Sequence, residues 1–191
     1  MAEEKSIDLA AMHAPLYHAL GEALSAFSGI ESALALIFAR FMGTDRFNLA
    51  LIAFDAINLT SPKLRVLRAV AKHQFDMESL DPKQEFDKLN RLLKRVEARA
   101  DLRVKLAHWT VSMWSEKMPI SNFDENIEAR LVPPWNSSKN LFFNPTESVS
   151  LPEITSFTTK CRQLNLELVN YYMAMANWEK RGRIEPDSGG D

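Results

Sequence analysis

An arginine and a histidine stand close together in the segment Glu97–Trp109, which reads EARADLRVKLAHW. Apolar residues recur at three- and four-residue steps up to this segment, which predicts a helix with one buried face. Arg103 falls three residues after Ala100 and four before Ala107, so we expect its guanidinium on or near that face. Because an unpaired buried charge is strongly destabilising, Arg103 must have a charged partner or line a cleft.

His108 follows Arg103 after four intervening residues, at the end of the same helical pattern. An unbroken helix would turn the imidazole about 140° away from the guanidinium. The two side chains can therefore meet only if the helix breaks near Leu106 or if one of them comes from another chain. Structural roles stay open as well. Arg103 could pair with Glu31 or another core acid, and His108 could cap the helix C-terminus, where a cation is favoured.

The sequence predicts five helices, and the fourth of them contains Arg103. Pro15 fits the first turn of the first long helix, and Gly43 follows its end. The pairs Ser61-Pro62 and Asp81-Pro82 combine a capping residue with a proline, which is a signal for a helix start. The expected ranges are about 15–41, 46–57, 60–74, 82–106 and 151–180.

The pattern changes after His108. Residues 109–114 alternate in polarity, 130–135 and 141–143 are short apolar runs, and several prolines interrupt the segment. We expect 109–150 to be irregular, with a small sheet. The predicted fold class is therefore all-α, an up-and-down bundle of about five helices with an irregular, short β-stranded insertion at about 109–150 before the last helix.

Length and composition predict one domain over 11–181, with flexible termini at 1–10 and 182–191. The net charge is -2, so no global positive field attracts nucleic acid, and any such contact would need a local patch. The single cysteine, Cys161, excludes an internal disulfide, and no cysteine–histidine spacing suits zinc. We expect no cofactor and no metal. The N-terminus lacks a signal peptide pattern and the most apolar stretch, Ile30–Met42, is short, so we expect a cytoplasmic protein.

The segment resembles the motif of the HEPN domains, which are all-α bundles, usually dimers, with an arginine four to six residues before a histidine. The common form reads roughly Arg-Asn-x-Leu-Ala-His-Gly. Arg103, Leu106, Ala107 and His108 match it in register. The long first helix with an acidic residue, here Glu31 within FSGIESAL, is similar to the family's layout.

This resemblance implies metal-independent cleavage of RNA in a cleft between two protomers, in a protein of bacterial defence or toxin type. His108 would then act as general acid or base, a role that suits a group whose charge changes near neutral pH. Arg103 would hold the scissile phosphate. Glu31 could orient one of the two, and Arg99, Lys105 and Trp109 are supporting or substrate-binding candidates. The implied partners are RNA, a second copy of the chain and a protein such as an antitoxin.

Two further patterns have a functional and a structural interpretation. The arginines at 91, 95, 99 and 103 recur every four residues and could grip a phosphate backbone, but interleaved acids favour a salt-bridged, solvated face. Of these arginines, Arg99 is the one expected to share a site with Arg103. Trp109 and later aromatic residues could stack bases or could cover a small core. The alternative function is a non-catalytic helical module that binds protein or nucleotide, with Arg103 in a structural ion pair.

Overall fold

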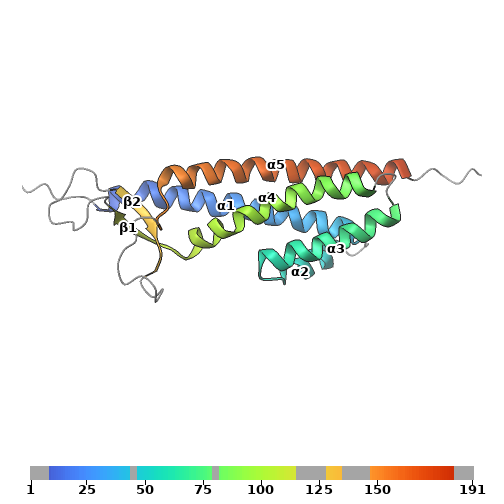
Figure 1. Ribbon diagram of the computed structural model, residues 1–191, viewed down its shortest axis with the longest axis horizontal. Coiled ribbons are helices and arrows are strands. Elements are labelled where there is room, and N and C mark those ends of the chain that lie inside the picture. The colour runs from blue at the N-terminus through green and yellow to red at the C-terminus, as the bar shows by residue number, and fades with distance from the viewer. Residues whose placement is uncertain (1–8, 44–46, 79–81, 115–127, 135–146, 183–191) are drawn as a thin grey trace, which may run out of the picture. The chain divides into compact units, whose positions relative to one another are not determined.

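The computed structural model describes residues 9–43, 47–78, 82–114, 128–134 and 147–182. Within them the chain forms five helices and one two-stranded sheet, which lies before the last helix (Figure 1). The predicted all-α bundle with a short β insertion is therefore confirmed. Of the termini expected to be flexible at 1–10 and 182–191, residues 1–8 and 183–191 lie outside the described residues, as does the apolar run 141–143. Leu9, Ala10 and Gly182 belong to helices.

Helix α1 spans Leu9–Phe41 and is longer than the sequence pattern predicted. Pro15 is exposed and lies inside the helix, so its placement in the first turn was wrong. A proline in the second turn costs a helical hydrogen bond, but continued burial on the far side of it, at Leu16 and Ala19, holds the helix in place. Gly43 follows the helix with φ +55, the left-handed conformation typical of a residue that ends a helix.

Helix α2 spans Phe47–Asp55 and α3 spans Thr60–Glu78. Helix α3 begins at the predicted capping segment, with Pro62 in its first turn, where a missing amide hydrogen does no harm. It continues about one turn beyond the predicted end. Its buried residues are Leu64, Leu67, Ala71 and Phe75, which recur at three- and four-residue steps.

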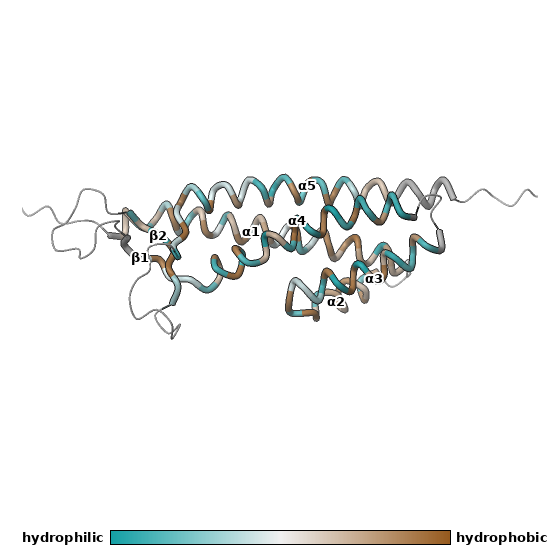
Figure 2. Tube along the Cα trace, viewed as in Figure 1, coloured by the Kyte–Doolittle hydropathy of each residue, from teal (hydrophilic) through white to brown (hydrophobic). Residues whose placement is uncertain are grey.

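Helix α4 spans Pro82–His108 without interruption. Leu89, Leu93 and Val96 form its buried face, as predicted. One prediction fails near the C-terminus, because Leu106 is buried there while Ala107 is exposed. In Figure 2, hydrophilic and hydrophobic residues recur in turn along α4 and α5, the pattern of helices with one buried side.

Strands β1 (Thr110–Trp114) and β2 (Glu128–Val132) pair antiparallel, with Thr110 opposite Val132. The first strand matches the alternating run at 109–114, whereas β2 begins two residues before the predicted run at 130–135. Leu131 also forms a bridge to Val149, just before helix α5, which spans Leu151–Gly182. The sheet thus connects the end of α4 to the start of α5.

The chain divides into two compact units. Unit 1 comprises Met1–Phe27 and Asp101–Cys161, and Phe27 stacks on Phe157 within it at 6.3 Å between ring centroids. Unit 2 comprises Ser28–Ala100 and Arg162–Asp191. In unit 2 the second half of α1 is buried on most of its sides, through the residues Ala33, Leu34, Ala35, Ile37, Phe38, Ala39 and Phe41.

An 18-residue window within α1 has a mean hydropathy of 1.4, so this helix could cross a membrane by length and composition alone. Signal sequences and core helices of soluble proteins pass the same test, and half of this window is buried inside the protein. The sequence interpretation, which considered only Ile30–Met42, overlooked the length over which α1 is apolar.

Candidate functional site

The Arg103 guanidinium lies against an aromatic ring. Arg103 is half-buried on α4, and its Cζ is 6.0 Å from the centroid of the Phe27 ring. Among the described residues of unit 1, no carboxylate forms an ion pair with it. A cation over a ring face is stabilised modestly, and the guanidinium keeps hydrogen-bond donors for another acceptor. The Arg103 guanidinium therefore lies near the buried face of α4, as the sequence predicted.

His108 is the last residue of α4 and is exposed. Because α4 runs unbroken through Leu106, the helical period turns the imidazole about 140° away from Arg103. The break near Leu106 that would let the two side chains of one chain converge is absent. Arg103 and His108 could therefore share a site only if one of the two side chains came from a second copy of the chain.

Lys105 and Trp109 lie next to each other at the end of α4. The Lys105 Nζ is 4.8 Å from the centroid of the Trp109 ring, in a cation–π contact. The backbone N–H of Trp109 donates to the Lys105 carbonyl at 2.8 Å, which continues the helical hydrogen bonding one residue past His108. Lys105 is exposed and Trp109 is half-buried, so this pair forms an accessible cation beside a partly covered ring.

Arg99 and Glu31 belong to unit 2. The Nη1 group of Arg99 donates to the Arg95 carbonyl at 2.6 Å, and its Nε is buried without an acceptor among the described residues. Glu31 is half-buried on α1 and forms no ion pair with another described residue of unit 2. The predicted roles of both residues in a site with Arg103 stay predictions.

The four-residue arginine stripe is not one uniform surface. Arg91 is exposed, whereas Arg95 forms a two-point ion pair with Glu167 of α5. This pair raises the pKa of Arg95 and lowers the pKa of Glu167, in both cases chiefly through the hydrogen bonds between them. The acids of α4 also pair elsewhere, since Glu97 contacts Arg68 at 2.9 Å. Of the four arginines of the stripe, only Arg95 forms an ion pair among the described residues, so the salt-bridged face that the sequence favoured is present at that position alone.

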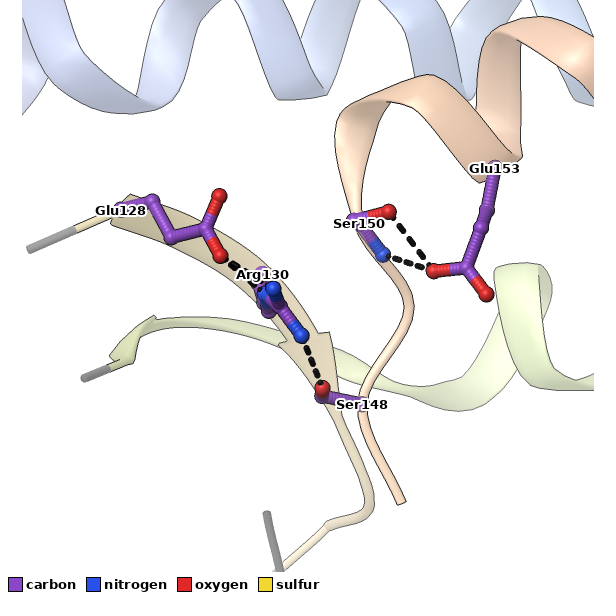
Figure 3. A network of polar contacts seen from close by, with 5 residues as sticks. All are labelled: Glu128, Arg130, Ser148, Ser150 and Glu153. Atoms are coloured by element: carbon purple, nitrogen blue, oxygen red, sulfur yellow. Dashed lines mark hydrogen bonds and ion pairs between the residues drawn. The ribbon is translucent and has the colours of Figure 1, made fainter. Parts of the chain in front are cut away.

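A polar network at the start of α5 escaped the sequence analysis (Figure 3). The Ser150 N–H and hydroxyl both donate to the Glu153 carboxylate, at 2.8 and 2.7 Å. These bonds, the backbone one first, lower the pKa of Glu153, and the charges of Arg130 and Lys105 add to the effect. Arg130 itself pairs with Glu128 and donates to the Ser148 hydroxyl at 3.0 Å. The signal was present as Ser-x-x-Glu, the spacing of a capping box.

No group of three or more His, Cys, Asp or Glu side chains that could hold a metal ion occurs among the described residues. The chain matches no protein-family model, no curated protein and no solved structure. The resemblance to the HEPN domains therefore rests on the sequence alone, through the motif around Arg103 and His108 and the long first helix that contains Glu31.

Proposed function

We propose that the chain is a HEPN-like, metal-independent endoribonuclease that works in the cytoplasm as a homodimer, with Arg103 and His108 as its catalytic residues. One observation supports this most directly. Arg103 lies against Phe27 and forms no ion pair with a described acid of its own unit. The imidazole of His108, five residues later, is exposed at the end of α4. A guanidinium and an imidazole with these environments are both free to contact a phosphodiester.

The chemistry requires one base, one acid and charge stabilisation. A base removes the proton of a ribose 2′-OH, the 2′-oxygen bonds to the adjacent phosphorus, and the bond from phosphorus to the 5′-oxygen breaks as that oxygen is protonated. His108 supplies the base or the acid, since imidazole changes its charge near neutral pH. Arg103 offsets the negative charge that grows on the phosphoryl oxygens. The step needs no oxidant and no metal.

The continuity of α4 supports a site whose two groups come from different copies. Within one copy, Arg103 and His108 point about 140° apart around the helix axis. A phosphodiester bound by Arg103 of one copy would therefore meet His108 of the other. This arrangement makes dimer formation a condition of activity, and a protein partner of antitoxin type that prevents it would inhibit the enzyme.

Cleavage of labelled RNA in the presence of a metal chelator tests the proposal. We expect His108→Ala and Arg103→Ala to lose cleavage by about a hundredfold or more, in the range for a lost general acid–base or charge-stabilising group. His18→Ala and Arg65→Ala are matched controls, because both residues are exposed and lie outside the site and outside the arginine stripe. Wild-type protein that leaves single-stranded and structured RNAs intact, or catalytic variants that cleave like the controls, would overturn the proposal.

A further inference from the structure

The aromatic ring that contacts the Arg103 guanidinium is itself fixed in the core. Phe27 of α1 is 1% exposed, and Arg103 reaches over it from α4, with its Cζ 6.0 Å from the ring centroid. Phe157 of α5 is buried as well, and its ring stacks on Phe27 with 12° between the two planes. A buried ring that packs against a second ring cannot tilt freely without opening a cavity. Residues of three helices within unit 1 therefore form a rigid support for one charged side chain.

An aromatic support leaves the guanidinium able to bind an anion. A carboxylate in the same place would accept some of the five N–H donors and would offset the positive charge. The face of a ring attracts the cation but leaves its charge intact. Phe27 can thus restrain Arg103 while the charge and most of the donors stay available to a phosphate.

Such a restraint favours both binding and catalysis. An arginine side chain is long and loses much rotamer entropy when a ligand fixes it. A ring that limits its movement beforehand reduces the entropy that remains to be lost. A positive charge that is already aimed at the phosphoryl oxygens also stabilises the transition state without first rearranging.

We infer that Phe27 is a positioning residue of the proposed site, which holds the Arg103 guanidinium ready for the scissile phosphate. The inference rests on the proposed function and adds to it a residue that acts only through Arg103. Phe157 supports Phe27 on the ring's other contact. Neither phenylalanine belongs to the motif around Arg103 and His108, and only contacts between helices identify them.

Steady-state cleavage of RNA by Phe27→Leu tests the inference. Leucine keeps an apolar side chain in the core but removes the ring. We expect kcat to fall by about tenfold or more, the scale of loss that follows a small displacement of a reacting group. Most of the loss should be in kcat and not in KM, because an aimed charge matters most in the transition state. Phe27→Tyr keeps a ring face and should retain cleavage. In the Arg103→Ala background, Phe27→Leu should cause no further loss, because the group through which it acts is gone.

Phe54→Leu is the matched control. Phe54 of unit 2 is also fully buried, stacks on Phe38 and has a cation over its ring, since the Lys63 Nζ is 5.5 Å from the ring centroid. The same change there removes the same kinds of contact, but the cation over the lost ring is a lysine that the proposed site does not use. Both variants should lose stability in thermal unfolding, because each leaves a cavity. Cleavage should fall only in Phe27→Leu.

The mobility of the Arg103 Nε–H group, measured by NMR relaxation, tests the restraint without RNA. Its order parameter in wild-type protein should exceed that of the exposed Arg65. The value should fall toward that of Arg65 in Phe27→Leu and stay unchanged in Phe54→Leu. If Phe27→Leu does not fold, Phe157→Leu takes its place in both measurements, and the same changes are expected because Phe27 then loses its support.

Two results would overturn the inference. One is an order parameter of Arg103 that loss of the ring does not lower. The other is a Phe27→Leu protein that cleaves RNA with the kcat of Phe54→Leu. Wild-type protein that cleaves no RNA would instead overturn the proposed function, and the order parameter would still decide whether Phe27 restrains the guanidinium.

Discussion

The Arg95 guanidinium and the Glu167 carboxylate form a two-point ion pair that joins α4 to α5 within unit 2. The Nη2 group donates to Oε1 at 2.8 Å, and the Nη1 group donates to Oε2. Both side chains are about one third exposed, so water screens part of their attraction. The parallel geometry nevertheless fixes the two helices relative to each other more firmly than a single contact between flexible side chains would.

Removing the carboxylate charge of Glu167 should make the protein less stable at neutral pH and make its free energy of unfolding less dependent on pH in acid. Arg95 lowers the pKa of folded Glu167 below its ordinary value of 4.5, so the stabilisation is fully present above that value and is lost as the pH falls through the lowered pKa. We expect Glu167→Gln to lower the free energy of unfolding by about 1 kcal/mol at neutral pH. Urea unfolding at several pH values should show that the difference from wild type vanishes in acid.

The control for this measurement is Asp76→Asn, since Asp76 is exposed on α3 and has no ion pair among the described residues. Its free energy of unfolding should stay within about 0.5 kcal/mol of wild type at every pH. A Glu167→Gln protein as stable as this control at neutral pH would show that the ion pair contributes nothing.

The sequence predicted the elements of the fold better than the contacts between them. The apolar period located the five helices of the described residues, and the proline start signals placed the beginnings of α3 and α4, because both are local features of the chain. Pro15, in contrast, predicted the start of α1 too late. The pairing of Arg95 with a glutamate 72 residues away is a long-range contact that no local pattern contains. The contact of Arg103 is also long-range. The sequence placed its charge near the buried face of α4, but no local pattern identified Phe27 of α1 as its neighbour.

The capping box at the start of α5 should stabilise the protein about as much as a typical helix cap does. Glu153→Ala removes the acceptor for two Ser150 donors, so we expect a loss of about 1 kcal/mol. Glu153→Gln is the matched variant, because a glutamine oxygen can still accept these bonds, and it should lose less. Chemical unfolding at neutral pH measures both. Equal losses for the two variants would mean that the charge and not the hydrogen bonds stabilises the helix start.

Two glycines of α1 should respond differently to alanine. A Cβ at Gly21 would meet no atom within 4 Å, so Gly21→Ala should raise the free energy of unfolding by about 1 kcal/mol through helix propensity. A Cβ at Gly29 would lie 3.0 Å from Nδ2 of Asn165 on α5, so Gly29→Ala should gain less or lose stability. Adding Asn165→Ala to Gly29→Ala should recover the difference. Equal gains at both glycines in thermal unfolding would refute the close approach of α1 and α5.

Replacing Arg103 should reduce stability only slightly. A cation over a ring contributes about 1 kcal/mol or less at a partly exposed position, whereas breaking a buried ion pair costs about 3–5 kcal/mol. Arg103→Gln should therefore unfold within about 1 kcal/mol of wild type, while the cleavage of RNA is lost. A loss of about 3 kcal/mol or more would favour the structural ion pair.

Mixing two inactive variants tests the shared site most directly. If Arg103 of one copy works with His108 of the other, a mixed dimer of Arg103→Ala and His108→Ala chains contains one intact site and one site that lacks both groups. We therefore predict that each variant alone cleaves RNA about a hundredfold more slowly than wild type or worse. The mixture should regain up to about a quarter of the wild-type rate, from half of the dimers with half of their sites intact. A mixture as inactive as its components, formed from chains shown to exchange, would contradict a site built across two copies.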